Sequence, residues 1–146
     1  MTMRTVAPLV GQGRSRGQAL AEFALVIPIF LILIFAVIEG GRFIFHYEVL
    51  NNATREGVRY AIIHGENSAD PIGPGDDARM ESVISDAAFA LPGGFDSVIL
   101  EYSGPNGNTN KRGSNVSVSA TYSYTPLMPV LPVITIAAEA NGVVNN

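Results

Sequence analysis

The most prominent pattern in the sequence is an apolar run at residues 19–38, ALAEFALVIPIFLILIFAVI, in which Glu22 is the only ionisable residue. A helix rises about 1.5 Å per residue, so this run spans about 30 Å, the thickness of the hydrocarbon core of a bilayer. A buried helix of a soluble protein is the alternative, but roughly one hundred remaining residues could hardly cover it on all sides. The run therefore predicts a transmembrane helix, which we place at residues 18–39.

The helical pattern continues beyond the apolar run. Apolar or small residues recur at spacings of three and four, namely Phe43, Tyr47, Leu50, Thr54, Gly57, Val58 and Ala61. Such spacing predicts a single helix to about residue 63, transmembrane in its first half and amphipathic in its second. Pro28 removes a backbone donor, so a kink is expected there. Gly40 and Gly41 either interrupt the helix or allow a close helix contact.

The remaining sequence predicts a small α+β domain. Residues 64–77 are a loop, and Asp77 is expected to cap a short helix at 78–91. Three strands follow at 97–102, 114–125 and 133–140, of which the second alternates valine, alanine and tyrosine with serine and threonine. The expected fold is α+β, with the long N-terminal helix packed on a small antiparallel sheet and one further short helix.

Charge predicts the orientation in the membrane. Arg4, Arg14 and Arg16 precede the apolar run, and no acid occurs in the first 21 residues. Residues 39–146 hold six Lys/Arg against twelve Asp/Glu, a formal charge of −6. By the positive-inside rule, residues 1–17 form a cytoplasmic basic leader and residues 40–146 an extracytoplasmic domain.

Composition and motifs argue against catalytic chemistry. The chain has no cysteine, and its net charge of −4 leaves no basic stripe for nucleic acid. His46 and His64 lack convergent partners, and the acids Glu66, Asp70, Asp76 and Asp77 lack the spacing of a calcium loop. Phosphate-binding, nucleophile-elbow and zinc-protease motifs are missing from the sequence. We therefore expect a non-enzymatic protein with no catalytic, cofactor, metal or small-molecule substrate site.

A glycine between the basic leader and the apolar run carries a more specific signal. Glu22 and Phe23 are the fifth and sixth residues after Gly17. This arrangement resembles the processing site of type IV prepilins, especially of the Tad/Flp branch. The onward sequence to about residue 64 resembles the TadE-like family of minor pilins (pseudopilins) of the tight-adherence pilus system. The features that carry the resemblance are Glu22-Phe23, Pro28, Glu39 with Gly41-Arg42 at the membrane exit, Asn52-Ala53, Arg55-Glu56-Gly57 and Arg59-Tyr60-Ala61.

The resemblance implies a function in pilus assembly. A prepilin peptidase would cut between Gly17 and Gln18, leaving a membrane-anchored subunit in the bacterial inner (cytoplasmic) membrane. Its partners would be the peptidase, other pilin or pseudopilin subunits, the pilus assembly platform and the lipid bilayer. The pili would serve adherence and, in relatives, secretion. Gly40 stands where the family more often has a bulky apolar residue.

The acid at residue 22 is explained by this interpretation. A lone carboxylate at the bilayer centre costs roughly 2.5–3.5 kcal/mol, and an ammonium partner near the interface offsets such a cost. The resemblance implies that Glu22 faces the new N-terminal amine of a neighbouring subunit. A glutamate that snorkels to the cytoplasmic surface is the alternative. At the other end of the run, Glu39 and Arg42 are expected to form an exposed ion pair of little energetic weight.

Two other functions remain open from the sequence. One is an uncleaved single-pass anchor that presents a protein-binding module. The other is a secreted adhesin or enzyme whose first 40 residues are a cleaved signal sequence, with the cut near Gly40.

Overall fold

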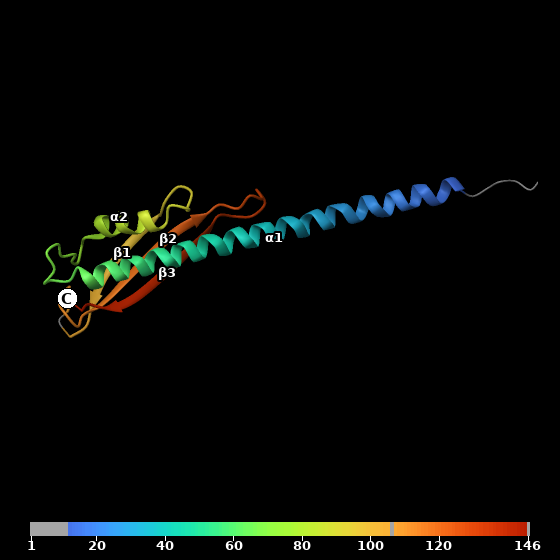
Figure 1. Cartoon of the computed structure of the whole chain (residues 1–146). Coiled ribbons are helices and arrows are strands. Elements are labelled where there is room, and N and C mark those ends of the chain that lie inside the picture. Colours follow the sequence, from blue (N-terminus) through green and yellow to red (C-terminus); the bar gives the residue numbers. More distant parts are fainter. Residues whose placement is uncertain (1–11, 106, 146) are drawn as a thin grey trace, which may run out of the picture. The chain divides into compact units, whose positions relative to one another are not determined.

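The computed structural model describes the backbone of residues 12–105 and 107–145, and side chains from residue 17 onward. The elements are α1 (Gln12–Ile63), α2 (Asp77–Ala87), β1 (Ser97–Ser103), β2 (Asn115–Tyr124) and β3 (Ile134–Val143) (Figure 1). This confirms the expected α+β class. The backbone contacts divide the chain into two units, one up to Ile38 and one from Glu39 onward, which we call the outer domain.

The part of α1 up to Ile38 exposes its apolar side chains. Its most apolar 18-residue window has a mean hydropathy of 2.8, and none of it is buried inside the protein. α1 is thus one helix that is long and apolar enough to cross a membrane. It stays helical through Pro28 and through the pair Gly40 and Gly41, so the glycines do not interrupt it.

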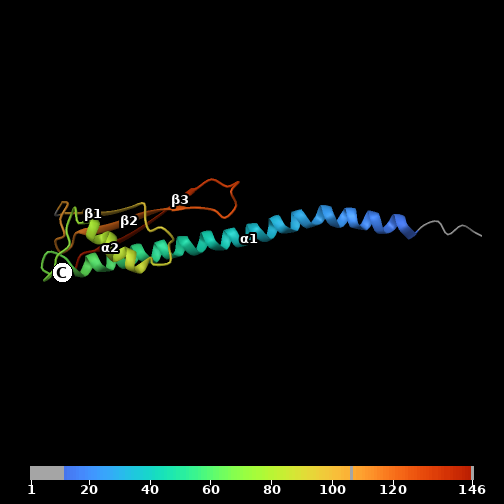
Figure 2. The same cartoon turned by 90° about the horizontal axis from the view of Figure 1, so that it is seen from above.

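The outer domain contains a three-stranded antiparallel sheet in the order β1-β2-β3 (Figure 2). Leu100 of β1 pairs with Val118 of β2, and Ala120 of β2 pairs with Ala138 of β3. The central strand alternates as its sequence predicts, because successive side chains of a strand point to opposite faces. One face of the sheet is therefore apolar, and its buried residues on β2 are Val116, Val118, Ala120, Tyr122 and Tyr124.

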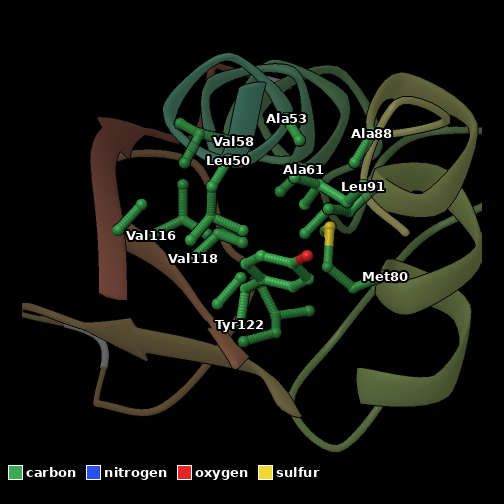
Figure 3. Close-up of a cluster of buried hydrophobic side chains, with 14 of the residues drawn as sticks. Leu50, Ala53, Val58, Ala61, Met80, Ala88, Leu91, Val116, Val118 and Tyr122 are labelled. Atoms are coloured by element: carbon green, nitrogen blue, oxygen red, sulfur yellow. The ribbon is translucent and has the colours of Figure 1, made fainter. Parts of the chain in front are cut away.

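Both helices cover the apolar face of the sheet, and the core lies between them and the strands (Figure 3). Leu50 and Ala61 of α1, Met80 of α2 and Val118 of β2 are each fully buried. A small residue allows the two helices to approach each other closely. A Cβ added at Gly57 would lie 3.0 Å from the sulfur of Met80, so this glycine lets α1 and α2 pack closely.

Within the outer domain, the ends of α2 and β3 differ most from the expected ones. α2 begins at Asp77 and ends at Ala87, four residues before the predicted end, and Asp77 lies inside the helix rather than capping it. Its carboxylate accepts a hydrogen bond from the backbone N–H of Leu100 (2.8 Å) and so joins α2 to β1. At the other end of the chain, β3 continues to Val143. Val144 is buried and exchanges backbone hydrogen bonds with Gly113 and Ser114 (both 2.9 Å), so the tail belongs to the domain.

Candidate assembly sites

The predicted processing site lies within α1. Gly17 and Gln18 are both helical and exposed, and among the described residues nothing comes within 4 Å of a Cβ placed at Gly17. The side-chain amide of Gln18 donates a hydrogen bond to the carboxylate of Glu22 at 3.1 Å, one helical turn later. Residue 18 and Glu22 are therefore on the same side of the helix. The basic residues Arg4, Arg14 and Arg16 lie outside the side chains that the structure describes.

Glu22 and Phe23 are exposed, and Phe23 keeps 62% of its surface accessible. Neighbouring apolar residues such as Leu20 and Val26 are also more than half exposed. In a bilayer these side chains face lipid or another helix, while the carboxylate needs a polar partner. Pro28 lies one and a half turns further along an uninterrupted helix, and the expected kink there stays a prediction.

The membrane-exit motif is built differently from the exposed pair that its spacing suggested. Glu39, the first residue of the outer domain, is buried, with only 8% of its surface exposed. Its carboxylate accepts a hydrogen bond from the hydroxyl of Tyr124, and both carboxylate oxygens lie within reach of the backbone N–H of Leu127 (3.2 and 3.3 Å). The pair with Arg42 exists at 3.6 Å, but the prediction that it is exposed was wrong for Glu39.

Arg42 lies close to both Glu39 and Tyr124. Its guanidinium lies 3.6 Å from the Glu39 carboxylate and 5.6 Å from the centre of the Tyr124 ring. A buried carboxylate is tolerated when it has a cation and hydrogen-bond donors around it. Gly40 and Gly41, in contrast, are exposed, and a Cβ at either would meet nothing within 4 Å. Within the described chain the two glycines therefore make no close contact.

His46 also belongs to the group of side chains around Glu39 and Tyr124, and the sequence did not reveal it. It is buried, and its ring lies 5.6 Å from that of Tyr122 and 5.3 Å from that of Tyr124. Its Nδ1 has no hydrogen-bond partner among the described residues. Burial, and secondarily the positive charge of Arg42, lowers the pKa of His46 from its usual value. The neutral imidazole is therefore the form that fits this position.

A helical spacing could have found this cluster. Glu39, Phe43, His46 and Leu50 follow one another at intervals of four, three and four residues, which places them on one face of α1. The prediction that Tyr47 lies on the buried face was wrong, because Tyr47 is 43% exposed and His46 takes that place. Polar residues within an apolar stripe are the available signal for a buried polar cluster.

Tyr124 is buried, and its surroundings determine the protonation of its hydroxyl. Burial and the hydrogen bond to Glu39 raise the pKa of the Tyr124 hydroxyl, so it stays protonated and acts as the donor to the carboxylate. Its ring also meets that of Phe43 edge to face at 5.5 Å. We call Glu39, Arg42, His46 and Tyr124 the exit cluster. It fixes the start of the outer domain to the end of β2 through the bond between Glu39 and Tyr124.

Residues 17–59, which include the predicted processing site, the apolar run and three members of the exit cluster, match the family model described as TadE-like protein. The resemblance is confirmed. TadE-like proteins are associated with the Tad pilus system and are not known for enzymatic activity. The match covers the helix and stops before the sheet. No curated protein and no solved structure matches the chain.

Proposed function

We propose that the protein is a membrane-anchored minor pilin or pseudopilin that takes part in the assembly of Tad/Flp-type pili. The observation that carries the proposal is the position of Gly17, Gln18 and Glu22 at the start of the TadE-like segment, directly before a helix that can span a membrane. Its role is structural and not catalytic. Its partners are a prepilin peptidase, other pilus subunits and the assembly platform, and the pili serve adherence.

The proposed topology places the leader in the cytoplasm and the outer domain outside the cytoplasmic membrane. The three arginines before the apolar run and the formal charge of −6 after it support this direction. Cleavage after Gly17 leaves 129 of the 146 residues and creates an amine at residue 18. Because Gln18 contacts Glu22 within the helix, the new amine starts one turn from that carboxylate.

The exit cluster argues against the secreted alternative. A signal-peptide cut near Gly40 would remove Glu39 from the outer domain. The Tyr124 hydroxyl and the Leu127 N–H would then lose their acceptor, and His46 would remain beside an unpaired Arg42. Leaving such groups without partners is costly, about 1–3 kcal/mol for each buried one. Retaining Glu39, the residue directly after the apolar run, therefore preserves the packing of the outer domain.

The test is the N-terminus of the mature protein, determined by intact-mass and N-terminal peptide analysis in a strain that produces the pili. A start at Gln18 is expected. A start at Met1 or Thr2 would instead support an uncleaved anchor, and a start near Gly40 or Gly41 a secreted protein.

A substitution sharpens this test. Gly17→Leu should abolish cleavage, because a peptidase that requires glycine before the cut cannot accept the larger side chain. Gly17 has open space around it, so the substitution disturbs no packing of the chain itself. Gly40→Leu is the matched control, since Gly40 is also helical with nothing within 4 Å, and it should be cleaved normally. Normal processing of Gly17→Leu would refute the assigned cut.

A further inference from the structure

The connector between β2 and β3, residues 125–133, exposes an unusual number of apolar side chains. Its sequence is TPLMPVLPV. Val130 is 86% exposed, Leu127 62% and Val133 58%. Exposed apolar side chains that cluster in one short segment indicate a contact surface, whereas scattered ones do not.

The connector emerges at the end of the outer domain where α1 enters. A Cβ at Gly142, which pairs with Val116 near the start of β2, would touch Ile62 at 2.6 Å. Tyr124 at the end of β2 touches Glu39. β2 therefore runs from the Ile62 end of the domain to the Glu39 end, and the connector follows Tyr124. Its Leu127 N–H is held by Glu39, the residue directly after the apolar run.

The neighbouring surface has the composition of a lipid interface. No charged residue occurs between Gly113 and Ala138. On α1, one to two turns beyond Glu39, the side chains of Ile44, Phe45 and Tyr47 are exposed to 61%, 53% and 43%. Aromatic and apolar side chains gather at the level of lipid headgroups beside membrane spans. The level of the connector is thus close to the outer membrane surface.

The backbone of the connector also suits a poorly hydrated environment. Pro126, Pro129 and Pro132 have no N–H to satisfy. Leu127 donates its N–H to Glu39, and Leu131 donates its N–H to the carbonyl of Met128 at 3.0 Å. The three prolines and the two bonded N–H groups reduce the number of amide groups that need water, which lowers the cost of placing an irregular loop in the interface.

We infer that the connector inserts its apolar side chains into the outer surface of the bilayer. The occupant is the lipid interface, because the connector is bonded to the residue at which the membrane span ends. Together with the span, this contact gives the outer domain a second attachment and holds its orientation on the membrane. The inference rests on the membrane placement of α1 in the proposed function.

The test uses single-cysteine variants of the full chain, which has no native cysteine. Val130→Cys and Val133→Cys are labelled with the environment-sensitive fluorophore NBD and reconstituted in phosphatidylcholine–phosphatidylglycerol vesicles. Emission should shift to shorter wavelength, nitroxide groups on shallow lipid positions should quench it, and aqueous iodide should quench it poorly. Because both positions are exposed in the connector, the substitutions leave the core unchanged.

Two control positions separate the possible failures. Asn108→Cys is also exposed but lies in the turn between β1 and β2, at the other end of β2, and it should be quenched by iodide and not by the lipid nitroxides. Leu33→Cys lies in the apolar run and reports the span itself. If Leu33 is quenched by lipid nitroxides while Val130 behaves like Asn108, the inference is overturned, and the connector faces water or another subunit. If Leu33 is not quenched, the membrane anchor fails as well.

Discussion

The carboxylate of Glu39 accepts a hydrogen bond from the hydroxyl of Tyr124, which lies 85 residues later in the chain. This bond joins the end of the apolar run to the end of the central strand. The bond lies within the outer domain and ties its sheet to the part of α1 that directly follows the apolar run.

Tyr124→Phe should destabilise the outer domain by about 1–3 kcal/mol, because it leaves the buried carboxylate without its hydroxyl donor. The ring contacts with Phe43 and His46 are retained, so the change isolates the hydroxyl group. The measurement is urea or thermal denaturation of the full chain in detergent, followed by far-UV circular dichroism and tyrosine fluorescence.

Tyr122→Phe is the matched control for this prediction. The Tyr122 hydroxyl donates only a long bond to the Pro92 carbonyl at 3.4 Å, so its loss should cost about 1 kcal/mol or less. Equal effects of the two substitutions would show that the bond to Glu39 contributes nothing specific.

Acid should weaken the outer domain through His46. Its folded-state pKa is lowered by burial and by Arg42, so the stabilisation is present above the unfolded value of about 6.5 and is lost as the pH falls through the lowered pKa. The other charged or titratable groups around it are Glu39, Tyr122 and Tyr124, and the two tyrosines stay protonated because their pKa values are raised. The measurement is the melting temperature between about pH 7 and pH 4.5.

His46→Phe keeps an aromatic ring between the tyrosines but removes the titrating group. Its melting temperature should therefore fall less steeply with acid than that of the natural protein. Carboxylates elsewhere in the domain titrate in both proteins and cancel in the comparison. Parallel curves for the two proteins would rule out His46 as the source of the acid sensitivity.

Alanine substitutions at Gly142 and at Gly40 should have opposite effects on the stability of the protein. A Cβ at Gly142 would lie 2.6 Å from Ile62 and 2.7 Å from Val58, so Gly142→Ala should cost about 1–3 kcal/mol through overpacking between β3 and α1. Gly40 has open space, and Gly40→Ala should stabilise the helix by roughly 0.5–1 kcal/mol. Denaturation of both variants checks the two signs.

Gly40→Ala carries a second readout. If the variant is more stable yet co-purifies less well with other pilus subunits, Gly40 makes a close helix contact in the assembly that the single chain does not show. If assembly is unchanged, the glycine has no such role, and the sign of its effect on stability is the only consequence.

The elements of the fold could be predicted because their signals are local. The spacing of Leu50, Thr54 and Ala61 indicates a helix, and the alternation along β2 indicates a strand with one buried face. Neighbouring residues carry this information without reference to distant parts of the chain. The end of α2 was placed too late, because Ala88 and Leu91 belong to the core although they lie beyond the helix.

The exit cluster could not be predicted because its members are distant in sequence. No residue close to Glu39 in the sequence indicates that Tyr124 and Leu127 will bond to it. An acid after an apolar run ordinarily faces water. The family resemblance marked Glu39 and Arg42 as a motif but gave no physical reason for it. The reason is tertiary: the motif holds the first residue of the outer domain against the end of the sheet.

Charge pairing at the other end of the run is tested by Glu22→Gln, which keeps the shape of the side chain and removes its charge. If Glu22 binds the N-terminal amine of a neighbouring subunit, the variant should still be cleaved after Gly17 but should co-purify poorly with other pilus subunits. Glu48→Gln is the matched control, because Glu48 is an exposed glutamate on the same helix within the outer domain and should leave assembly intact.

A double variant decides whether the amine is the partner. Without cleavage no amine exists at residue 18, so adding Glu22→Gln to Gly17→Leu should reduce co-purification no further than Gly17→Leu alone. Additive losses would mean that Glu22 binds a different group. If Glu22→Gln assembles like the natural protein, the carboxylate needs no partner from a neighbour, and its position near the membrane surface is sufficient to hold it there.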